Sequence, residues 1–125
     1  MQRTFMHSKI HRATVTDSNL NYVGSITISP ELLEAAEIGV HELVHVVNVN
    51  NGARFETYTI LDDSPEPPAA QIVINGAAAR LVQPGDKVII ISYAQLNEEE
   101  RVGFKSRVVH VNDANEITET TLLSS

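Results

Sequence analysis

Residues 43–60 read LVHVVNVNNGARFETYTI, two runs rich in β-branched residues on either side of Asn51-Gly52. Asn-Gly is favoured in two-residue hairpin turns, because both central positions of such a turn need a positive φ. The stretch therefore predicts a β-hairpin with strands at 43–49 and 54–60. Similar short runs, separated by turn residues, recur along the chain, so the sequence predicts a mainly β fold.

The other elements are predicted from the same kinds of local signal. Ser29-Pro30-Glu31 predicts the start of a short helix, with a hydroxyl at the cap, proline in the first turn and an acid near the positive end of the dipole. Gly39 is expected to end it. Residues 97–101 could form a second, charged helix, and 62–68, with three prolines, predict an exposed loop. The polar tail after Asn112 is expected to fray. Further strands are expected at 9–16, 22–29, 71–74, 87–93 and 105–111.

Length and composition exclude several classes of protein. A chain of 125 residues suits one domain spanning 1–125, and 42% hydrophobic with 20% charged residues is typical of a folded globular protein. The absence of cysteine excludes disulfides, thiolate zinc sites and a cysteine nucleophile. A formal charge of −7 argues against a nucleic-acid partner. Without a signal peptide or a long apolar run, the expected location is cytoplasmic, with no membrane association.

His41-Glu42-Leu43-Val44-His45 matches the H-E-x-x-H pattern of zinc peptidases. The pattern binds zinc only on a helix, where positions i and i+4 lie on one face. Here it follows Gly39 and leads into a predicted strand. Residues four apart on a strand are separated by roughly 13 Å, too far for two bonds of about 2 Å to one ion. We therefore expect no metal site, and interpret these residues as polar positions near the start of a strand.

A candidate reactive pair is Gly24-Ser25. A serine that directly follows glycine can attack the preceding carbonyl, because glycine tolerates the strained backbone that this requires. The pair is one of several ordered blocks: KIHR at 9–12, YVGS at 22–25, NGARFETY at 51–58 and NGAAA at 75–79. Together these blocks resemble the pyruvoyl-dependent aspartate 1-decarboxylase family, from residue 1 to about residue 111. Val23 stands where some members have an acid, and the loop at 62–68 resembles a small insertion.

The resemblance implies a double-psi β-barrel that assembles as a homotetramer, with active sites between subunits. It also implies a zymogen that cuts itself between Gly24 and Ser25. The Ser25 hydroxyl would attack the Gly24 carbonyl to form an ester. Elimination and hydrolysis would then release residues 1–24 and leave a pyruvoyl group on residues 25–125. That covalent group is the implied cofactor, with no metal and no pyridoxal phosphate. A maturation factor is a further candidate partner.

The implied reaction converts L-aspartate to β-alanine and CO₂ for pantothenate biosynthesis. The substrate amine would form a Schiff base with the pyruvoyl carbonyl, which accepts the electron pair left behind by CO₂. The implied catalytic residues are Ser25 and Tyr58, with Tyr58 as the proton donor to the α-carbon. Arg54 can hold a carboxylate of this dianion through a two-pronged bond. The full expected substrate-binding set is Thr57, Arg54, Lys9, Gly76, Ala77 and Ala78, and the expected supporting residues are Asn75, His11 and Tyr22.

These residues also have ordinary structural interpretations. Arg54 could be a solvated charge after a turn, Lys9 a guard against strand aggregation, and Tyr58 a half-buried strand aromatic. Strict alternation places Arg54 and Tyr58 on one face of their strand and Thr57 on the other, so either a bulge re-aims the strand or two subunits share its faces. The alternative function is a small, non-catalytic β-barrel that binds a ligand or partner and leaves Ser25 uncut.

Overall fold

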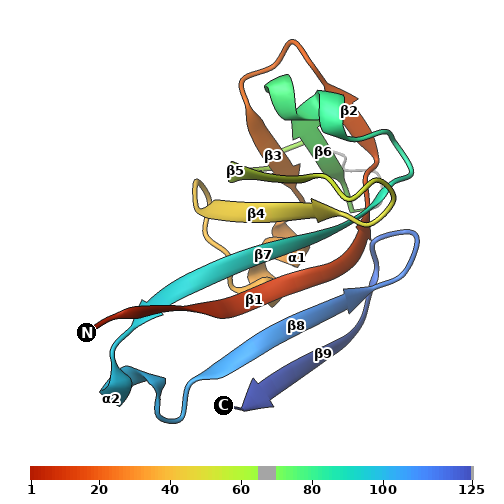
Figure 1. Cartoon of the computed structure of the whole chain (residues 1–125). Coiled ribbons are helices and arrows are strands. Elements are labelled where there is room, and N and C mark those ends of the chain that lie inside the picture. The colour runs from red at the N-terminus through yellow and green to blue at the C-terminus, as the bar shows by residue number, and fades with distance from the viewer. Residues whose placement is uncertain (65–69, 125) are drawn as a thin grey trace.

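The computed structural model describes residues 1–64 and 70–124, in which nine strands form one sheet and three short helices accompany it (Figure 1). The spatial order is β2-β6-β3-β5-β4-β7-β1-β8-β9. The predicted mainly β fold, a small β-barrel with short helices, is confirmed. The strands are β1 (Arg3–Thr14), β2 (Asp17–Asn19), β3 (Ser25–Ile28), β4 (Leu43–Asn48), β5 (Arg54–Leu61), β6 (Ile72–Asn75), β7 (Lys87–Leu96), β8 (Lys105–Val111) and β9 (Ile117–Ser124). The helices are α1 (Pro30–Ala36), the 3-10 helix η1 (Gly76–Leu81) and α2 (Glu98–Arg101). None of the helices within these described ranges has the length and apolar character to cross a membrane.

The core is built from alternate residues of the central strands. On β3 and β6, every second side chain is a fully buried isoleucine, and β4 and β7 contribute valine and isoleucine in the same way. Helix α1 adds Leu32, Leu33 and Ala36 to the same hydrophobic cluster. The intervening residues of these strands face outward, and this outward face carries the candidate functional side chains. Fully buried core residues include Ile10, Ile26, Ile28, Val44, Val46, Ile72, Ile74, Val88, Ile90 and Val109.

The predicted hairpin at 43–60 is confirmed. Strands β4 and β5 pair without interruption from Leu43 opposite Tyr58 to Val47 opposite Arg54. The predicted two-residue turn was wrong, because Gly52 has a φ of 75° but Asn51 does not take a positive φ. The connection is a longer loop, closed by bonds from the Asn48 N–H to the Ala53 carbonyl and from the Gly52 N–H to the Asn48 carbonyl. The paired stretch of β5 contains no bulge. A bulge lies instead on β1, between Ile10 and Ala13 opposite β7, where Arg12 has a φ of 63°.

Several predicted boundaries were wrong because tertiary pairing extended or shortened the elements. Strand β1 begins at Arg3 rather than Lys9, since its first residues pair with the end of β7. Strand β3 begins only at Ser25. Helix α1 starts as predicted but ends at Glu37, which takes the left-handed conformation (φ 53°) before Gly39 is reached. Its cap residue Ser29 makes no side-chain capping bond.

Two predictions near the end of the chain had opposite outcomes. Helix α2 forms as predicted, and Asn97 caps it through reciprocal bonds with Glu100. The prediction that the tail frays after Asn112 was wrong. Strand β9 pairs antiparallel with β8 along its length, after a turn in which the Asn112 side chain accepts bonds from two backbone N–H groups.

The predicted loop at 62–68 is described only in part, because residues 65–69 lie outside the described residues. Within the described part, the Ser64 hydroxyl donates a hydrogen bond to the carboxylate of Asp62.

Asn115 fastens this C-terminal hairpin to the rest of the sheet. Its side chain is 1% exposed, accepts a hydrogen bond from the Thr14 N–H at 2.7 Å and donates to the carbonyls of Thr14 and Ala70 at 2.9 and 3.0 Å. Its backbone has a φ of 61°, a conformation that Asn tolerates better than most residues.

We therefore expect Asn115→Ala to lower the free energy of unfolding by about 2–4 kcal/mol, because it leaves buried polar groups unpaired and strains the backbone. Asn115→Gly should cost less, since glycine keeps the positive φ at no steric cost. Urea unfolding in a Ser25→Ala background would measure both on a single uncut chain. The exposed Thr120→Ala on β9 is the control, and an equal loss in all three variants would contradict the role of Asn115.

Candidate active site

Ser25 is the first residue of β3 and lies between β5 and β6. It is completely buried, whereas Gly24 beside it is exposed. Antiparallel pairing with β6 places Ser25 opposite Asn75. Parallel pairing with β5 matches Ile26 to Thr59, so that Ser25, one residue earlier, is level with Tyr58. Three strands thus bring three of the predicted site residues together.

Hydrogen bonds fix the orientation of the Ser25 hydroxyl. It donates to the Val23 carbonyl at 2.9 Å and accepts from the Asn75 Nδ2 amide at 3.1 Å. The same amide nitrogen donates to Thr27 Oγ1 at 3.0 Å. These three polar side chains share the outward face, because Ile26 and Ile28 occupy the core face of β3. Asn75, which the sequence predicts as a supporting residue, therefore contacts Ser25 directly.

Gly76 packs closely against the segment that precedes Ser25. Its φ is 75°, and a Cβ added there would lie 2.6 Å from Gly24 Cα and 2.9 Å from Gly24 N. The same Cβ would lie 3.3 Å from the Tyr22 carbonyl oxygen. Only glycine therefore fits between β6 and the segment that precedes Ser25. Ala77 and Ala78 follow on η1, the first exposed and the second half-buried.

Known proteins match this chain over nearly its whole length. A model of the aspartate decarboxylase family matches residues 1–118. The chain belongs to the aspartate decarboxylase family. It is 58% identical to the aspartate 1-decarboxylase of Clostridium beijerinckii over 118 residues, which cover 94% of this chain and 93% of that protein. It is 56% identical to that of Staphylococcus epidermidis over 119 residues (95% and 91%) and 55% identical to that of Sulfurimonas denitrificans over 114 residues (91% and 92%).

Within this family member, the two adjacent residues Thr57 and Tyr58 face opposite sides of β5. The Tyr58 side chain is on the outward face with Ser25, is 37% exposed, and its ring lies 6.2 Å from that of His41. Thr57 is half-buried, opposite Val44 in the register with β4. Strand β5 pairs with β4 without a bulge over this stretch. Of the two explanations offered by the sequence, a bulge that turns Thr57 to the face of Tyr58 is therefore excluded.

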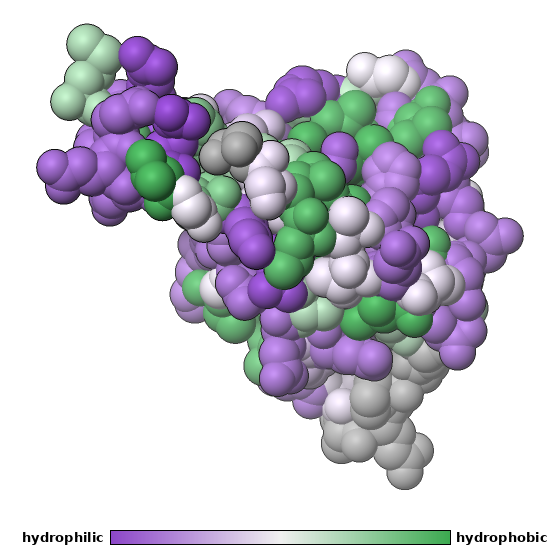
Figure 2. All heavy atoms as spheres, turned by 90° about the horizontal axis from the view of Figure 1, so that it is seen from below, coloured by the Kyte–Doolittle hydropathy of each residue, from purple (hydrophilic) through white to green (hydrophobic). Residues whose placement is uncertain are grey.

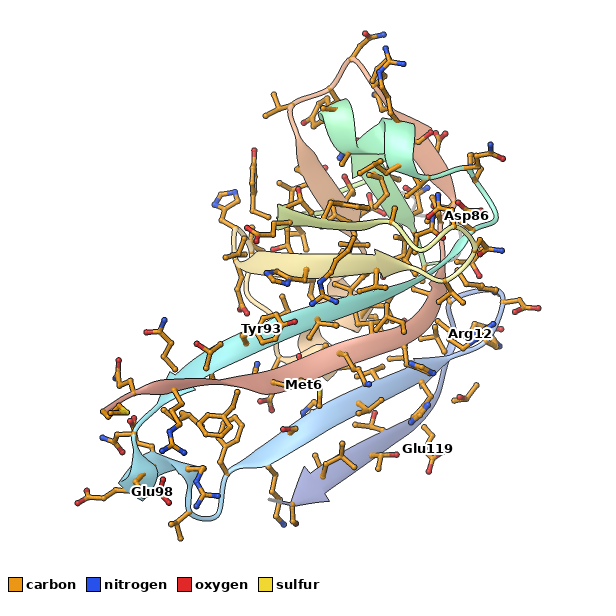
Figure 3. The ribbon with its side chains drawn as sticks, viewed as in Figure 1. Met6, Arg12, Asp86, Tyr93, Glu98 and Glu119 are labelled. Atoms are coloured by element: carbon orange, nitrogen blue, oxygen red, sulfur yellow. The ribbon has the colours of Figure 1, made fainter. Side chains whose placement is uncertain are left out.

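Arg54 also lies on the outward face, but its side chain is directed along the sheet toward β4 and β7. Its Nη2 atom donates to His45 Nδ1 at 3.2 Å and to the Tyr93 hydroxyl at 3.1 Å (Tyr93 is labelled in Figure 3). Sequence reasoning missed both partners. The H-E-x-x-H match had drawn attention to His45, and its assignment to a strand is confirmed, since β4 begins at Leu43.

Lys9 and His11 lie on β1, four positions from β3 in the sheet order. They line a cavity of about 360 Å³ together with residues of β8 and β9. Tyr22, by contrast, lies close to Gly76 through its carbonyl, and its side chain is 52% exposed. One chain therefore gathers Tyr22, Ser25, Tyr58, Asn75 and Gly76. It leaves Lys9 and His11 apart from them and directs the Arg54 guanidinium toward β4 and β7.

His11 is held in a setting that favours its neutral form. Burial lowers the pKa of its imidazole, and the positive charge of Lys9 lowers it further. His110 and Arg12 act in the same direction, and the His110 ring packs edge-on against His11 at 5.7 Å. The buried His11 Nδ1 has no hydrogen-bond partner within residues 1–64 and 70–124.

The Gly76 contact predicts a specific defect. We expect Gly76→Ala to displace Gly24 and slow cleavage between Gly24 and Ser25 by about 100-fold, the usual order for a displacement of about 1 Å at a reacting group. The measurement is the rate at which the fragments 1–24 and 25–125 appear by mass spectrometry. Gly103→Ala is the matched control, because Gly103 also has a positive φ (79°) but open space around it. Equal cleavage rates for the two variants would contradict the steric argument.

Proposed function

We propose that this chain decarboxylates L-aspartate to β-alanine and CO₂ at a pyruvoyl group that it makes from its own Ser25. Family membership supports the reaction, and the observation that carries the self-processing step is the buried Ser25 hydroxyl, oriented by hydrogen bonds next to the exposed Gly24. The whole chain, 1–125, would fold as one domain before it is cut into residues 1–24 and 25–125.

The cleavage chemistry uses groups that already adjoin one another. Ser25 Oγ would bond to the Gly24 carbonyl carbon while its proton passes to the Ser25 nitrogen and the Gly24–Ser25 C–N bond breaks, which leaves an ester and a free amine on Ser25. Removal of the Ser25 Cα proton would then break the Cβ–Oγ bond and release residues 1–24 with a new carboxylate. Water would convert the remaining dehydroalanine to the pyruvoyl group with loss of ammonia. Asn75, which donates to Oγ, would stabilise the negative charge that this oxygen carries away.

The surroundings of Ser25 fit a small, planar carbonyl group at this position. Gly76 leaves no side chain between β6 and the cut end, and Asn75 provides an N–H donor at hydrogen-bond distance. Such a group supplies an electrophilic carbonyl that condenses with an amine and accepts the electrons released with CO₂. Tyr58, level with Ser25 on the outward face, would deliver the proton to the α-carbon. Arg54 would hold a substrate carboxylate, and the backbone of Gly76, Ala77 and Ala78 would line the site.

We also propose that the enzyme is a homotetramer with active sites between subunits. Lys9 and His11 lie four strands from Ser25, so a second copy is a natural source of these cationic groups. Tyr58 is 37% exposed on the outward face of β5, where a second subunit can approach it, whereas Thr57 pairs with the buried Val44 on the core face. Figure 2 shows hydrophobic side chains at the surface among polar ones, and Leu43, Leu122 and Leu123 are each more than 40% exposed. We further propose a cytoplasmic location and a possible maturation factor as partner.

Ser25→Ala tests the central proposal. Removing the nucleophile should leave one chain of unaltered mass with no decarboxylation of L-aspartate, while circular dichroism stays that of a folded β protein. Ser29→Ala is the matched control, since Ser29 is also buried but its hydroxyl makes no hydrogen bond in the described residues. Retained activity in Ser25→Ala would overturn the mechanism. A parent protein that remains uncut even after incubation with a cell extract would support the non-catalytic alternative.

Tyr58→Phe separates cleavage from turnover. The variant keeps the ring against His41 but loses the proton donor, so cleavage should proceed while kcat falls about 100-fold or more, the usual contribution of a positioned acid. Intact mass gives the cleaved fraction, and kcat is expressed per cleaved chain. A cleaved Tyr58→Phe protein with normal kcat would show that another group protonates the product.

A further inference from the structure

Arg54 is held by two neutral side chains rather than by an acid. Three of the other eight Lys and Arg residues pair with carboxylates in the described part of the chain: Arg101 with Glu98, Arg107 with Glu37 at 2.9 Å, and Lys87 with Asp113 at 2.6 Å. Arg54 instead bonds to an imidazole and a phenol, and makes no ion pair within residues 1–64 and 70–124. Its charge is therefore oriented without being neutralised, which is what a site for a carboxylate needs.

The three residues come from three neighbouring strands. Residue pairing sets His45 of β4 opposite Glu56 of β5 and opposite Ile91 of β7. Arg54 is two residues from Glu56 on β5, and Tyr93 is two residues from Ile91 on β7, so both side chains can reach His45. The His45 ring packs edge-on against that of Tyr93, with the ring centroids 4.9 Å apart. Only Nη2 of the guanidinium is used in these bonds. Nη1 and Nε form no hydrogen bond in the described part of the chain, and could both serve a two-pronged carboxylate contact.

The bond from Arg54 determines the protonation state of His45. A guanidinium has only donors, so His45 Nδ1 must act as the acceptor and carry no proton. The proton is then on Nε2, which lies 3.4 Å from Glu56 Oε1. We propose that neutral His45, together with Tyr93, is a positioning residue that aims Arg54 at the substrate carboxylate. This inference rests on the carboxylate-binding role proposed above for Arg54.

The groups that face His45 are Arg54 and Glu56 of β5 and Tyr93 of β7. His7 of β1 and Glu42 before β4 line the same cleft of about 750 Å³. Among these groups, Arg54 is the one that bonds to His45 Nδ1, so a change at position 45 acts on substrate binding through the guanidinium.

Two substitutions at position 45 test the acceptor role. His45→Leu removes the acceptor, and we expect the KM for L-aspartate to rise about two- to fivefold, as for a partly exposed polar contact, with little change in kcat per cleaved chain. His45→Gln keeps an acceptor, so its KM should stay near that of the parent. Tyr93→Phe, which removes the second acceptor, should raise KM in the same way as His45→Leu.

His7→Gln is the matched control, because this histidine lines the same cleft but contacts Glu37 and Ser92 instead of Arg54. It should keep the KM of the parent. All variants are compared as cleaved protein, verified by intact mass. An unchanged KM in both His45→Leu and Tyr93→Phe would overturn the inference, as would an equal rise of KM in His7→Gln.

Arg54→Ala distinguishes failure of this inference from failure of the proposed function. If cleaved Arg54→Ala has the parent's KM, Arg54 does not bind the substrate carboxylate, and the positioning role of His45 is overturned with it. If Arg54→Ala raises KM but neither His45→Leu nor Tyr93→Phe does, the carboxylate role stands and only the positioning role is wrong.

Discussion

The close approach of Gly76 to Gly24 is the constraint on which the candidate site depends. A single methyl group at position 76 would lie 2.6 Å from Gly24 Cα, so β6 and the segment before β3 meet at the limit of backbone contact. That contact lets the antiparallel pair of Ser25 and Asn75 form at the very start of β3. The Asn75 amide then reaches the Ser25 hydroxyl, and Tyr58 lies level with it on the other neighbouring strand. The positions of Ser25, of the Asn75 amide that donates to it and of the proposed acid Tyr58 thus depend on one packing contact.

The sequence predicted those elements that are determined by turn, cap and strand-forming residues close together in the chain. The hairpin at 43–60 follows from Asn51-Gly52 and the flanking β-branched residues, and helix α2 follows from its cap at Asn97. The candidate site around Ser25 was predicted from family blocks, whereas the contacts of Arg54 with His45 and Tyr93 were not. Those contacts join strands far apart in sequence, and only the register of three strands brings them together. Strand β9 was missed for a similar reason, because its pairing with β8 and the anchoring of Asn115 are tertiary effects.

The acidic character of the chain makes fixed positive charge important at the site. With a formal charge of −7, the protein as a whole repels a substrate that has two carboxylates, so attraction must come from a few placed cations. Arg101, Arg107 and Lys87 are each neutralised by a carboxylate close by. Arg54 keeps its charge because imidazole and phenol oxygen orient it as acceptors without opposing it. Lys9 lies on β1, four strands from Ser25 in the sheet order. Lys9 would therefore add positive charge at the site mainly if a neighbouring subunit presented it.

The sheet order also explains how a chain could be cut at Gly24 without falling apart. Residues 1–24 contain β1 and β2, and neither is an independent unit. Strand β1 lies between β7 and β8 and pairs with both, while β2 pairs with β6 beside Ser25. Ile10 and Ala13 of β1 are fully buried in the common core. Breaking the Gly24–Ser25 peptide bond would remove none of these pairings, so the two proposed fragments would stay held together by the same hydrogen bonds and burial. On the proposed mechanism, cleavage would therefore add a reactive end to a structure whose strands stay paired.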